Sequence, residues 1–209
     1  MIRPEGFRGA AFGTAADGDA RTDPVARVRF AAALEVSPDW AYVHQVHGAA
    51  VVTAAEPGLR GDADAIITAI DDLPLCVATA DCVPVIIEGE RMTAAVHAGW
   101  RGIVAGVVEA TMAAIRDSGD VPLRAAVGPA IGPCCYEVGD EVLDGLAPFA
   151  AETTWGSTSV DLPAAVVARL GSLPMWQADR CTFDSEELNS YRRDRTKLRQ
   201  VAVTWLPTG

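Results

Sequence analysis

The sequence has few of the residues on which several common mechanisms depend. It contains one lysine, Lys197, and no GxxxxGK[ST] segment, so a P-loop nucleotide site is excluded. A Schiff-base enzyme would have to use that single amine. Only three histidines occur in 209 residues, namely His44, His47 and His97. A multinuclear copper oxidase needs far more imidazole ligands than three, so that class of enzyme is excluded as well.

Long apolar runs are also missing. No apolar stretch approaches the ~18 residues that cross a bilayer, and Met1–Gly6 has no apolar segment of the kind found in signal peptides. We therefore expect a cytoplasmic protein without a membrane partner. In a cytoplasmic protein, cysteines are expected to be free thiols or metal ligands rather than members of a disulfide scaffold. The five cysteines are Cys76, Cys82, Cys134, Cys135 and Cys181.

Positive charge is scarce, because 17 Lys and Arg residues face 28 Asp and Glu residues and leave a net charge of -11. Such a surface repels phosphate backbones, so nucleic acid is not an expected partner, and a small anion can bind only in a locally positive pocket. Half of the residues are hydrophobic (50%), which suffices for a packed core and excludes intrinsic disorder. We expect residues 1–209 to form a single domain and the protein to be a monomer.

Short β-like runs dominate the first half of the chain and helices come later. Residues 1–24 are expected to be irregular, because residues 7–24 are rich in Gly, Ala and Asp and show no period. Helices are predicted over Val25–Leu34, over Gly102–Arg116 and, capped by Asp161, over Leu162–Leu170. Strands are predicted at Ala41–Val43, Ala50–Thr53, Ala65–Thr68, Leu75–Thr79, Val83–Ile87, Ala94–Val96, Leu123–Val127 and Val201–Trp205. This order indicates a layered α/β or α+β domain rather than a doubly wound fold.

The histidines lie in two short segments, His44–Gly48 and Val96–Gly102, each beside the end of a predicted strand. Between them, Asp81 and Cys82 interrupt an apolar stretch, where an acid and a thiol cost free energy unless they are paired or bound. Two histidines and one cysteine from three strand ends are the protein ligands of an open catalytic zinc site. The same donors also suit a copper electron-transfer centre. In the simplest alternative, Cys82 is an ordinary buried residue and the histidines are hydrogen-bonded loop residues.

The segment Gly99–Gly102 opens the strongest predicted helix. Its free amide groups and the charge of Arg101 together predict an anion site, although Arg101 could equally be a surface residue beside a glycine turn. Asp62 and Asp64 alternate with alanines, which is more typical of a solvated strand edge than of acid–base groups.

Two further segments are interpreted as structural. Cys134 and Cys135 adjoin a turn at Gly128–Pro133, and adjacent cysteines cannot easily bind one ion together, so we interpret both as packing residues. The charged neighbourhood of Tyr191-Arg192-Arg193 is interpreted as a solvated face.

Six segments together resemble the multicopper polyphenol oxidoreductase, or laccase-domain, family, whose members are described as purine nucleoside phosphorylases that also deaminate adenosine. The segments are His44–Gly48, Gly61–Ala65, Thr79–Val85, His97–Gly102, Gly128–Val138 and Ser190–Asp194, in the order of the family. The resemblance covers roughly residues 40–205. It implies a single domain of α/β/β/α layers with mixed sheets and one zinc ion.

Position by position, the resemblance implies His47, Cys82 and His97 as the zinc ligands. We expect catalytic roles for Asp81, Arg101 and His44, and binding of substrate or phosphate by Gly99, Arg101, Gly102 and Gln45. The implied reaction is phosphorolysis of adenosine-, inosine- or guanosine-type nucleosides to base and ribose 1-phosphate, with adenosine deamination as a second activity.

The chain departs from the family at Phe12–Arg21, which is short and lacks a Ser-Leu-Asn segment, and after Asp194, where the usual glycine is missing. The N-terminal departure puts the nucleoside preference in question. Three alternatives stay open: a copper-dependent polyphenol oxidase, a non-catalytic protein with a structural zinc site, and a metal-free thiol hydrolase using Cys82 and His97.

Overall fold

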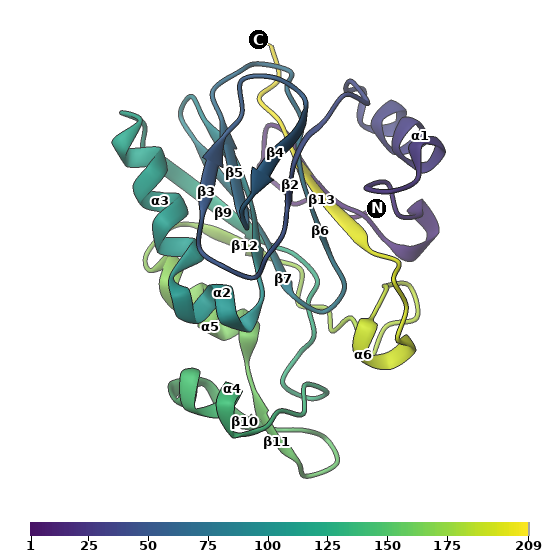
Figure 1. The fold of residues 1–209 in the computed structure, drawn as a ribbon, viewed down its shortest axis with the longest axis vertical. Helices are drawn as coiled ribbons and strands as arrows, with labels where there is room; N and C mark the ends of the chain where they lie inside the picture. Colours follow the sequence, from purple (N-terminus) through teal and green to yellow (C-terminus); the bar gives the residue numbers. More distant parts are fainter. Residues whose placement is uncertain (209) are drawn as a thin grey trace.

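Two mixed β-sheets lie face to face in the computed structural model, which describes residues 1–208 (Figure 1). The five-stranded sheet has the order β1 (Ala10–Phe12), β13 (Gln200–Thr204), β6 (Leu75–Thr79), β2 (Ala41–His44), β4 (Gly58–Asp62). The six-stranded sheet has the order β12 (Met175–Gln177), β9 (Pro122–Val127), β7 (Val83–Gly89), β8 (Thr93–Ala98), β5 (Ala65–Thr68), β3 (Val51–Thr53). Each sheet combines parallel and antiparallel pairs.

Helices cover the outer face of each sheet, so the layers follow the order α/β/β/α. Helices α3 (Val107–Asp117) and α5 (Leu162–Leu170) pack on the six-stranded sheet, and α1 (Pro24–Leu34) packs on the five-stranded sheet. Neighbouring side chains of one strand point into different cores, as strand geometry requires. Ile86 packs between the two sheets, whereas Ile87 packs under the helices. This double burial explains the continuous apolar runs, and the predicted layer order is confirmed.

The structure corrects two expectations about secondary structure. The helix predicted over Gly102–Arg116 is two helices, α2 (Trp100–Ala105) and α3, because Gly106 between them adopts a left-handed φ of 86°. The N-terminal 24 residues, expected to be irregular, contain β1 and the short 3-10 helix η1 (Ala15–Asp17). The sequence did not predict β4, β12, β10 (Ala150–Glu152), β11 (Thr158–Val160), α4 (Asp140–Gly145), η2 (Ala147–Phe149) or α6 (Tyr191–Asp194), most of them a single turn or three residues long.

The connection between β6 and β7 sets the position of the functional residues. Because β6 belongs to the five-stranded sheet and β7 to the six-stranded sheet, residues 80–82 cross from one sheet to the other. Strands β2 and β6 are parallel and end at the same edge, and the start of β7 pairs with the end of β8. Loops from both sheets therefore meet at one end of the stack.

Across residues 1–208, none of the helices has both the length and the apolar character needed to cross a membrane.

Candidate active site

The end of the stack described above brings together His47, Cys82 and His97. Their ligand atoms all lie within 4.8 Å of one another, with His47 Nε2 at 3.9 Å from Cys82 Sγ. The rings of His47 and His97 are nearly perpendicular, with their centroids 4.7 Å apart. His47 lies in the loop after β2, Cys82 in the crossing between the sheets, and His97 on β8. These residues form a possible metal site, with the ligand set that the family resemblance implied.

The carboxylate of Asp64 holds two of these residues in place. Its Oδ1 atom accepts hydrogen bonds from His97 Nδ1 at 2.7 Å and from the amide of His47 at 2.9 Å. Its Oδ2 atom accepts from the amides of Gly48 at 2.6 Å and Val46 at 3.2 Å. This clamp stabilises the left-handed backbone of His47, whose φ is 60°. A hydrogen bond from the second ring nitrogen to a carboxylate is the usual way in which proteins orient a metal-binding histidine.

Asp64 also corrects an interpretation made from the sequence. We expected both Asp62 and Asp64 at a solvated strand edge, but Asp64 is fully buried, and Asp62 alone is exposed. Burial opposes ionisation of Asp64, yet the hydrogen bonds from His97 and from the loop amides outweigh it and lower the pKa of the carboxyl group. Asp64 is therefore ionised at neutral pH. Residues two positions apart share a face of a strand, so the alternating Asp-Ala pattern did not distinguish Asp64 from Asp62.

Cys82 and His97 form a charged pair in the absence of a metal. Burial alone would raise the pKa of the Cys82 thiol, but the charges and hydrogen bonds of His97 and His47 lower it to about 6. Burial likewise opposes protonation of His97, while Cys82 and Asp64 raise its pKa to about 9. A thiolate and two imidazole nitrogens are a donor set that suits zinc, with one position left for water or substrate. The residues present therefore fit the metal that the family implies.

Two glycines make the close approach of these loops possible. A Cβ atom on Gly99 would lie 2.9 Å from His47 Cδ2 and 3.1 Å from Cys82 Sγ. A Cβ atom on Gly102 would lie 2.9 Å from the backbone oxygen of Gly48. Gly99 thus borders the metal site, whereas buried Gly102 packs helix α2 against the loop that carries His47.

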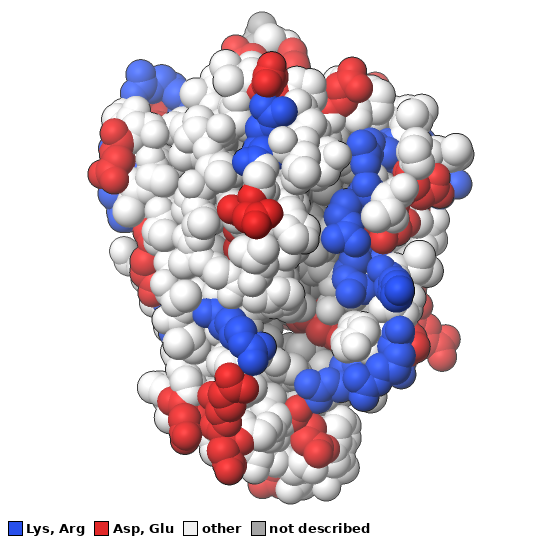
Figure 2. Space-filling view, in the orientation of Figure 1, with Lys and Arg blue, Asp and Glu red and all other residues white. Residues whose placement is uncertain are grey.

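A cleft of about 460 Å³ opens beside the metal site. Within residues 1–208 its lining contains five arginines and a single carboxylate, Asp81. The arginines are Arg21, Arg101, Arg192, Arg195 and Arg199. Figure 2 shows basic side chains along two sides of a hollow in this face of the molecule. A protein of net charge -11 therefore holds a locally positive cleft, which is the condition that its composition set for binding a small anion.

Aromatic rings hold most of these arginines in position. Arg101 stacks on Trp100, with 4.2 Å between its guanidinium carbon and the ring centroid, and Arg192 lies 5.0 Å from the Tyr136 ring. The ring of Tyr191 contacts both Arg195 and Arg199. Such stacking leaves the edge of a guanidinium free for bidentate contact with phosphate. Arg101 also pairs with exposed Glu141 at 3.3 Å. Arg21, Arg192, Arg195 and Arg199, like Tyr136, were not identified as site residues from the sequence.

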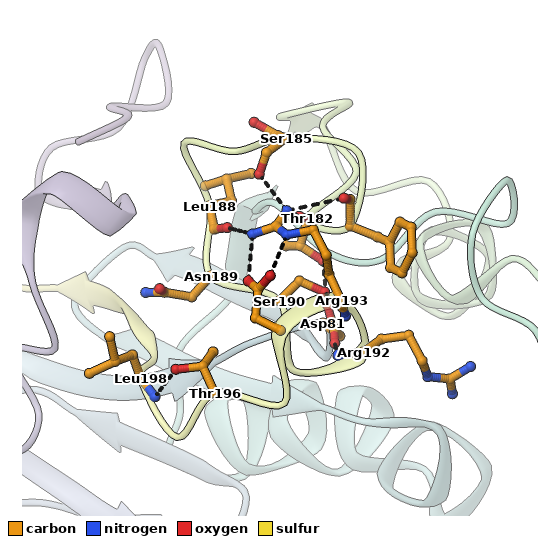
Figure 3. A network of polar contacts seen from close by, with 12 residues as sticks. Asp81, Thr182, Ser185, Leu188, Asn189, Ser190, Arg192, Arg193, Thr196 and Leu198 are labelled. Carbon is orange, nitrogen blue, oxygen red and sulfur yellow. Dashed lines mark hydrogen bonds and ion pairs between the residues drawn. The ribbon is translucent and has the colours of Figure 1, made fainter.

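Asp81 lies against the C-terminal segment, and both of its carboxylate oxygens accept hydrogen bonds from that segment (Figure 3). Oδ1 accepts from the hydroxyl of Thr182 at 2.6 Å, and Oδ2 accepts from the amide of Arg192 at 2.7 Å. Nearby, the guanidinium of Arg193 donates to the carbonyl oxygens of Thr182, Phe183, Ser185 and Leu188. The segment interpreted as a solvated face is thus anchored by Arg193 and by Asp81, and only Tyr191 of the three is exposed.

The remaining residues expected at the site lie at its border. The side-chain amide of Gln45 donates to the carbonyl of Ala78 at 2.8 Å and accepts from the amide of the same residue at 2.9 Å, so it ties the His47 loop to β6. Gln45 still lines the cleft. His44 is exposed and contacts Asp62, with 2.9 Å between Nδ1 and Oδ1. In the described chain, the cleft lining includes Gln45 and His47 but not His44.

Comparison with known proteins identifies the family. A family model described as multi-copper polyphenol oxidoreductase laccase matches residues 5–207. A purine nucleoside phosphorylase of Streptomyces coelicolor is 42% identical over 79% of this chain and 74% of its own length. The purine nucleoside phosphorylase YfiH of Escherichia coli is 35% identical over 83% of this chain and 75% of its own.

A solved structure has the same fold. The crystal structure of YlmD from Geobacillus stearothermophilus superimposes with a TM-score of 0.85 at 25% identity, covering 100% of this chain and 98% of that one. The resemblance found in six short motifs is thereby confirmed over the length of the chain. The chain belongs to the multi-copper polyphenol oxidoreductase, or laccase-like, family.

Proposed function

We propose that this protein is a zinc-dependent purine nucleoside phosphorylase. It would transfer the ribosyl group of an adenosine-, inosine- or guanosine-type nucleoside from the purine to inorganic phosphate, giving free base and ribose 1-phosphate. The observation that carries the proposal is the juxtaposition of the His47–Cys82–His97 group with a cleft lined by five arginines. The names of the curated relatives support the choice of nucleoside and phosphate as substrates.

The arginines would bind phosphate and hold it against the sugar. Arg101 and Arg192 project from different segments, and both stack on rings that line the cleft. Because the guanidinium group is planar and permanently charged, two such groups can bind one phosphate through several charge-assisted hydrogen bonds. Zinc bound to His47, Cys82 and His97 would supply a Lewis acid beside this anion. Gly99, which has no side chain, would keep the space between the zinc ion and the bound phosphate open.

Tyr136 is the residue that we assign to the purine. Its ring lines the cleft, and burial, with the negative charge of Cys82, raises the pKa of its hydroxyl to about 12. The hydroxyl therefore remains protonated at neutral pH and can donate a hydrogen bond to a ring nitrogen of the departing base. We assign Asp81 a positioning role, because Thr182 and Arg192 already occupy its two oxygens.

We extend the proposal to adenosine deamination, in which water attacks the purine and releases inosine and ammonia. Zinc held by His47, Cys82 and His97 would supply a Lewis acid for water in this reaction as well. The extension rests on the family resemblance and on the donor set, and it is tested separately with adenosine in phosphate-free buffer. Ammonia release that depends on bound metal would support it, and its absence at full zinc occupancy would overturn it.

The main test is the phosphate dependence of nucleoside cleavage. Zinc-loaded protein incubated with inosine should release hypoxanthine and ribose 1-phosphate, both quantified by chromatography, only when phosphate is present. Equal base release without phosphate would mean hydrolysis and would overturn phosphorolysis. Cys82→Ser should lose most of its zinc and its activity, because a serine hydroxyl stays protonated near neutral pH and supplies no charge to the ion. His44→Ala should retain zinc and serves as the matched control.

Metal analysis distinguishes the proposal from a phenol oxidase. The family description names copper, and a His-Cys-His donor set accepts copper as well as zinc. Protein purified without added metal should contain about one equivalent of zinc in this donor set, which provides one metal position. Copper at that position, accompanied by oxidation of a phenol, would replace the nucleoside proposal with the oxidase.

A further inference from the structure

Three thiols converge at a second place, between the loop that follows β9 and the segment that follows β12. The sulfur atoms of Cys134, Cys135 and Cys181 all lie within 4.8 Å of one another. Cys134 Sγ and Cys135 Sγ are 3.0 Å apart, too far for a disulfide bond of about 2.05 Å. These residues, here called the three-thiol cluster, share no member with the His47–Cys82–His97 group.

Backbone pairing fixes the cluster in the fold. Ala130 and Cys181 form a parallel β-bridge, in which the amide of Thr182 donates to the carbonyl of Ala130 at 2.9 Å. The amide of Cys135 donates to the carbonyl of Gly132 at 3.1 Å and closes the turn that carries the adjacent thiols. The bridge therefore sets Cys181 opposite this turn. The convergence of the three sulfurs follows from backbone hydrogen bonds and does not depend on flexible side chains alone.

Gly132 is fitted to the sulfur atoms around it. A Cβ atom at this position would lie 3.3 Å from Cys134 Sγ, which is tighter than most real Cβ contacts, and 3.4 Å from Cys181 Cβ, at the edge of ordinary van der Waals contact. The amide of Gly132 donates to Cys181 Sγ at 3.2 Å. Backbone N–H groups aimed at sulfur stabilise thiolates and are a regular feature of metal–thiolate centres.

We propose that Cys134, Cys135 and Cys181 form a second metal site, which binds a single soft cation, the cuprous ion. Thiolates select soft metals such as Cu(I) and zinc. Metal–sulfur bonds of about 2.3 Å around one ion place three sulfurs about 4 Å apart. All three sulfurs already lie within 4.8 Å of one another, and binding would require the Cys134 and Cys135 sulfurs, now 3.0 Å apart, to separate by about 1 Å through side-chain rotation. Structural zinc sites use four protein ligands, and zinc sites with three protein ligands include at least one histidine. In the described part of the chain this cluster offers three sulfurs and no imidazole, a set that suits three-coordinate Cu(I).

The surroundings provide access for the ion. Cys181 and Gly132 line a cavity of about 410 Å³. The polar residues Asp161, Asp179 and Arg180 also line it. Cys134 and Cys181 are half-buried, and Cys135 is buried against the core below α5. The prediction that the adjacent cysteines are packing residues considered the pair alone. Cys181, 46 positions further along the chain from Cys135, adds a third thiol, and three thiols together can bind a soft metal ion.

Anaerobic titration of the zinc-loaded protein with Cu(I), against a chromogenic Cu(I) chelator, tests the proposal. We expect the protein to retain one equivalent of Cu(I) and to develop an ultraviolet thiolate-to-copper charge-transfer band. Cys181→Ser should weaken Cu(I) binding at least 100-fold and abolish the band. Cys76→Ser, a change of a buried thiol in the core below α1, should alter neither. An unchanged band in Cys181→Ser, or complete removal of copper from the wild-type protein by the chelator, would overturn the proposal.

A second measurement on the unsubstituted protein does not depend on how the variants fold. Native protein is treated with iodoacetamide with and without one equivalent of Cu(I), and the modified peptides are identified by mass spectrometry. Bound copper should protect Cys134 and Cys181 together. Protection confined to Cys82 would assign the copper to the first site and overturn the proposal. A Cys134–Cys181 disulfide that persists under reducing conditions and excludes copper would overturn it as well.

Discussion

Replacement of Asp64 by asparagine should loosen the metal site without removing any ligand. In the wild-type protein, one carboxylate oxygen accepts from the His97 ring and the His47 amide, and the other accepts from the Gly48 and Val46 amides. Asparagine has one acceptor oxygen, and its amino group would face N–H donors on the other side. Either the ring or the loop must therefore lose its partner, whichever way the amide is turned.

The magnitude follows from these contacts. Hydrogen bonds to a charged group contribute about 1.5–3 kcal/mol each, so loss of two of them should lower the free energy of unfolding by about 3 kcal/mol or more. Loss of a carboxylate that orients a ligand lowers metal affinity about 10- to 100-fold, which is about 1.4–2.7 kcal/mol.

Because folding lowers the pKa of Asp64, the contribution of this carboxylate to the free energy of unfolding is present above the unfolded pKa of 3.8. That contribution is lost as the pH falls through the folded pKa. Asp64→Asn should lack this acid dependence.

Zinc competition against a fluorescent chelator measures the affinity. Urea unfolding at neutral pH and at about pH 2.5, below the unfolded pKa of 3.8, measures the stability and its acid dependence. Asp62→Asn is the matched control, because Asp62 makes an exposed contact with His44 that should contribute less than about 1 kcal/mol. Zinc affinity should remain unchanged in Asp62→Asn. Equal zinc affinity in Asp64→Asn and the wild-type protein would refute the reasoning that this carboxylate organises the site.

Three further predictions concern the cleft and the metal ligands. Gly99→Ala places a Cβ atom 3.1 Å from the Cys82 sulfur and should lower zinc affinity about tenfold or more. Gly139→Ala is the control in the same chelator assay. Gly139 is also a helix N-cap but has open space around it, so this change should leave zinc affinity unchanged. Arg101→Ala should raise the KM for phosphate roughly 10- to 100-fold in steady-state assays, as expected for the loss of a charge-assisted contact, while exposed Arg116→Ala on α3 should not. In metal-free protein, alkylation of Cys82 should increase through a midpoint near pH 6, because its thiolate form exists above that pH, and a midpoint near 9 measured by peptide mass spectrometry would contradict the charged pair.

The layers of the fold could be predicted from the sequence because burial leaves a clear pattern. Strands β6, β7 and β8 are buried on both faces, so they appear as short continuous apolar runs between turn residues. The break at Gly106 was missed because the apolar spacing of α2 and α3 continues across it. Strands of three residues, such as β10 and β12, have too few positions to show a period. β12 is added to the edge of the six-stranded sheet beside β9, whereas β10 and β11 pair only with each other.

The metal ligands could be proposed because the two histidine segments contain glycines at predicted strand ends and Cys82 interrupts an apolar stretch between them. The family resemblance then selected His47 over His44. Asp64 was misjudged for a physical reason. A carboxylate in an Asp-Ala pattern is normally solvated, and only tertiary contacts show that four N–H groups surround this one. Sequence spacing indicates which residue types are available, but it does not indicate how many donors a buried acid will meet.

The positive cleft was beyond the sequence because its charges come from three distant parts of the chain. Arg21 precedes α1, Arg101 lies on α2, and Arg192, Arg195 and Arg199 belong to the C-terminal segment. Net charge constrains the far field of a protein, and here it argues against large polyanions. A small anion instead interacts mainly with the charges nearest to it. In the cleft, aromatic rings hold the arginines in position, and the single carboxylate among the described lining residues is already hydrogen-bonded. An acidic protein and a phosphate-binding cleft are therefore compatible, because the two properties act over different distances.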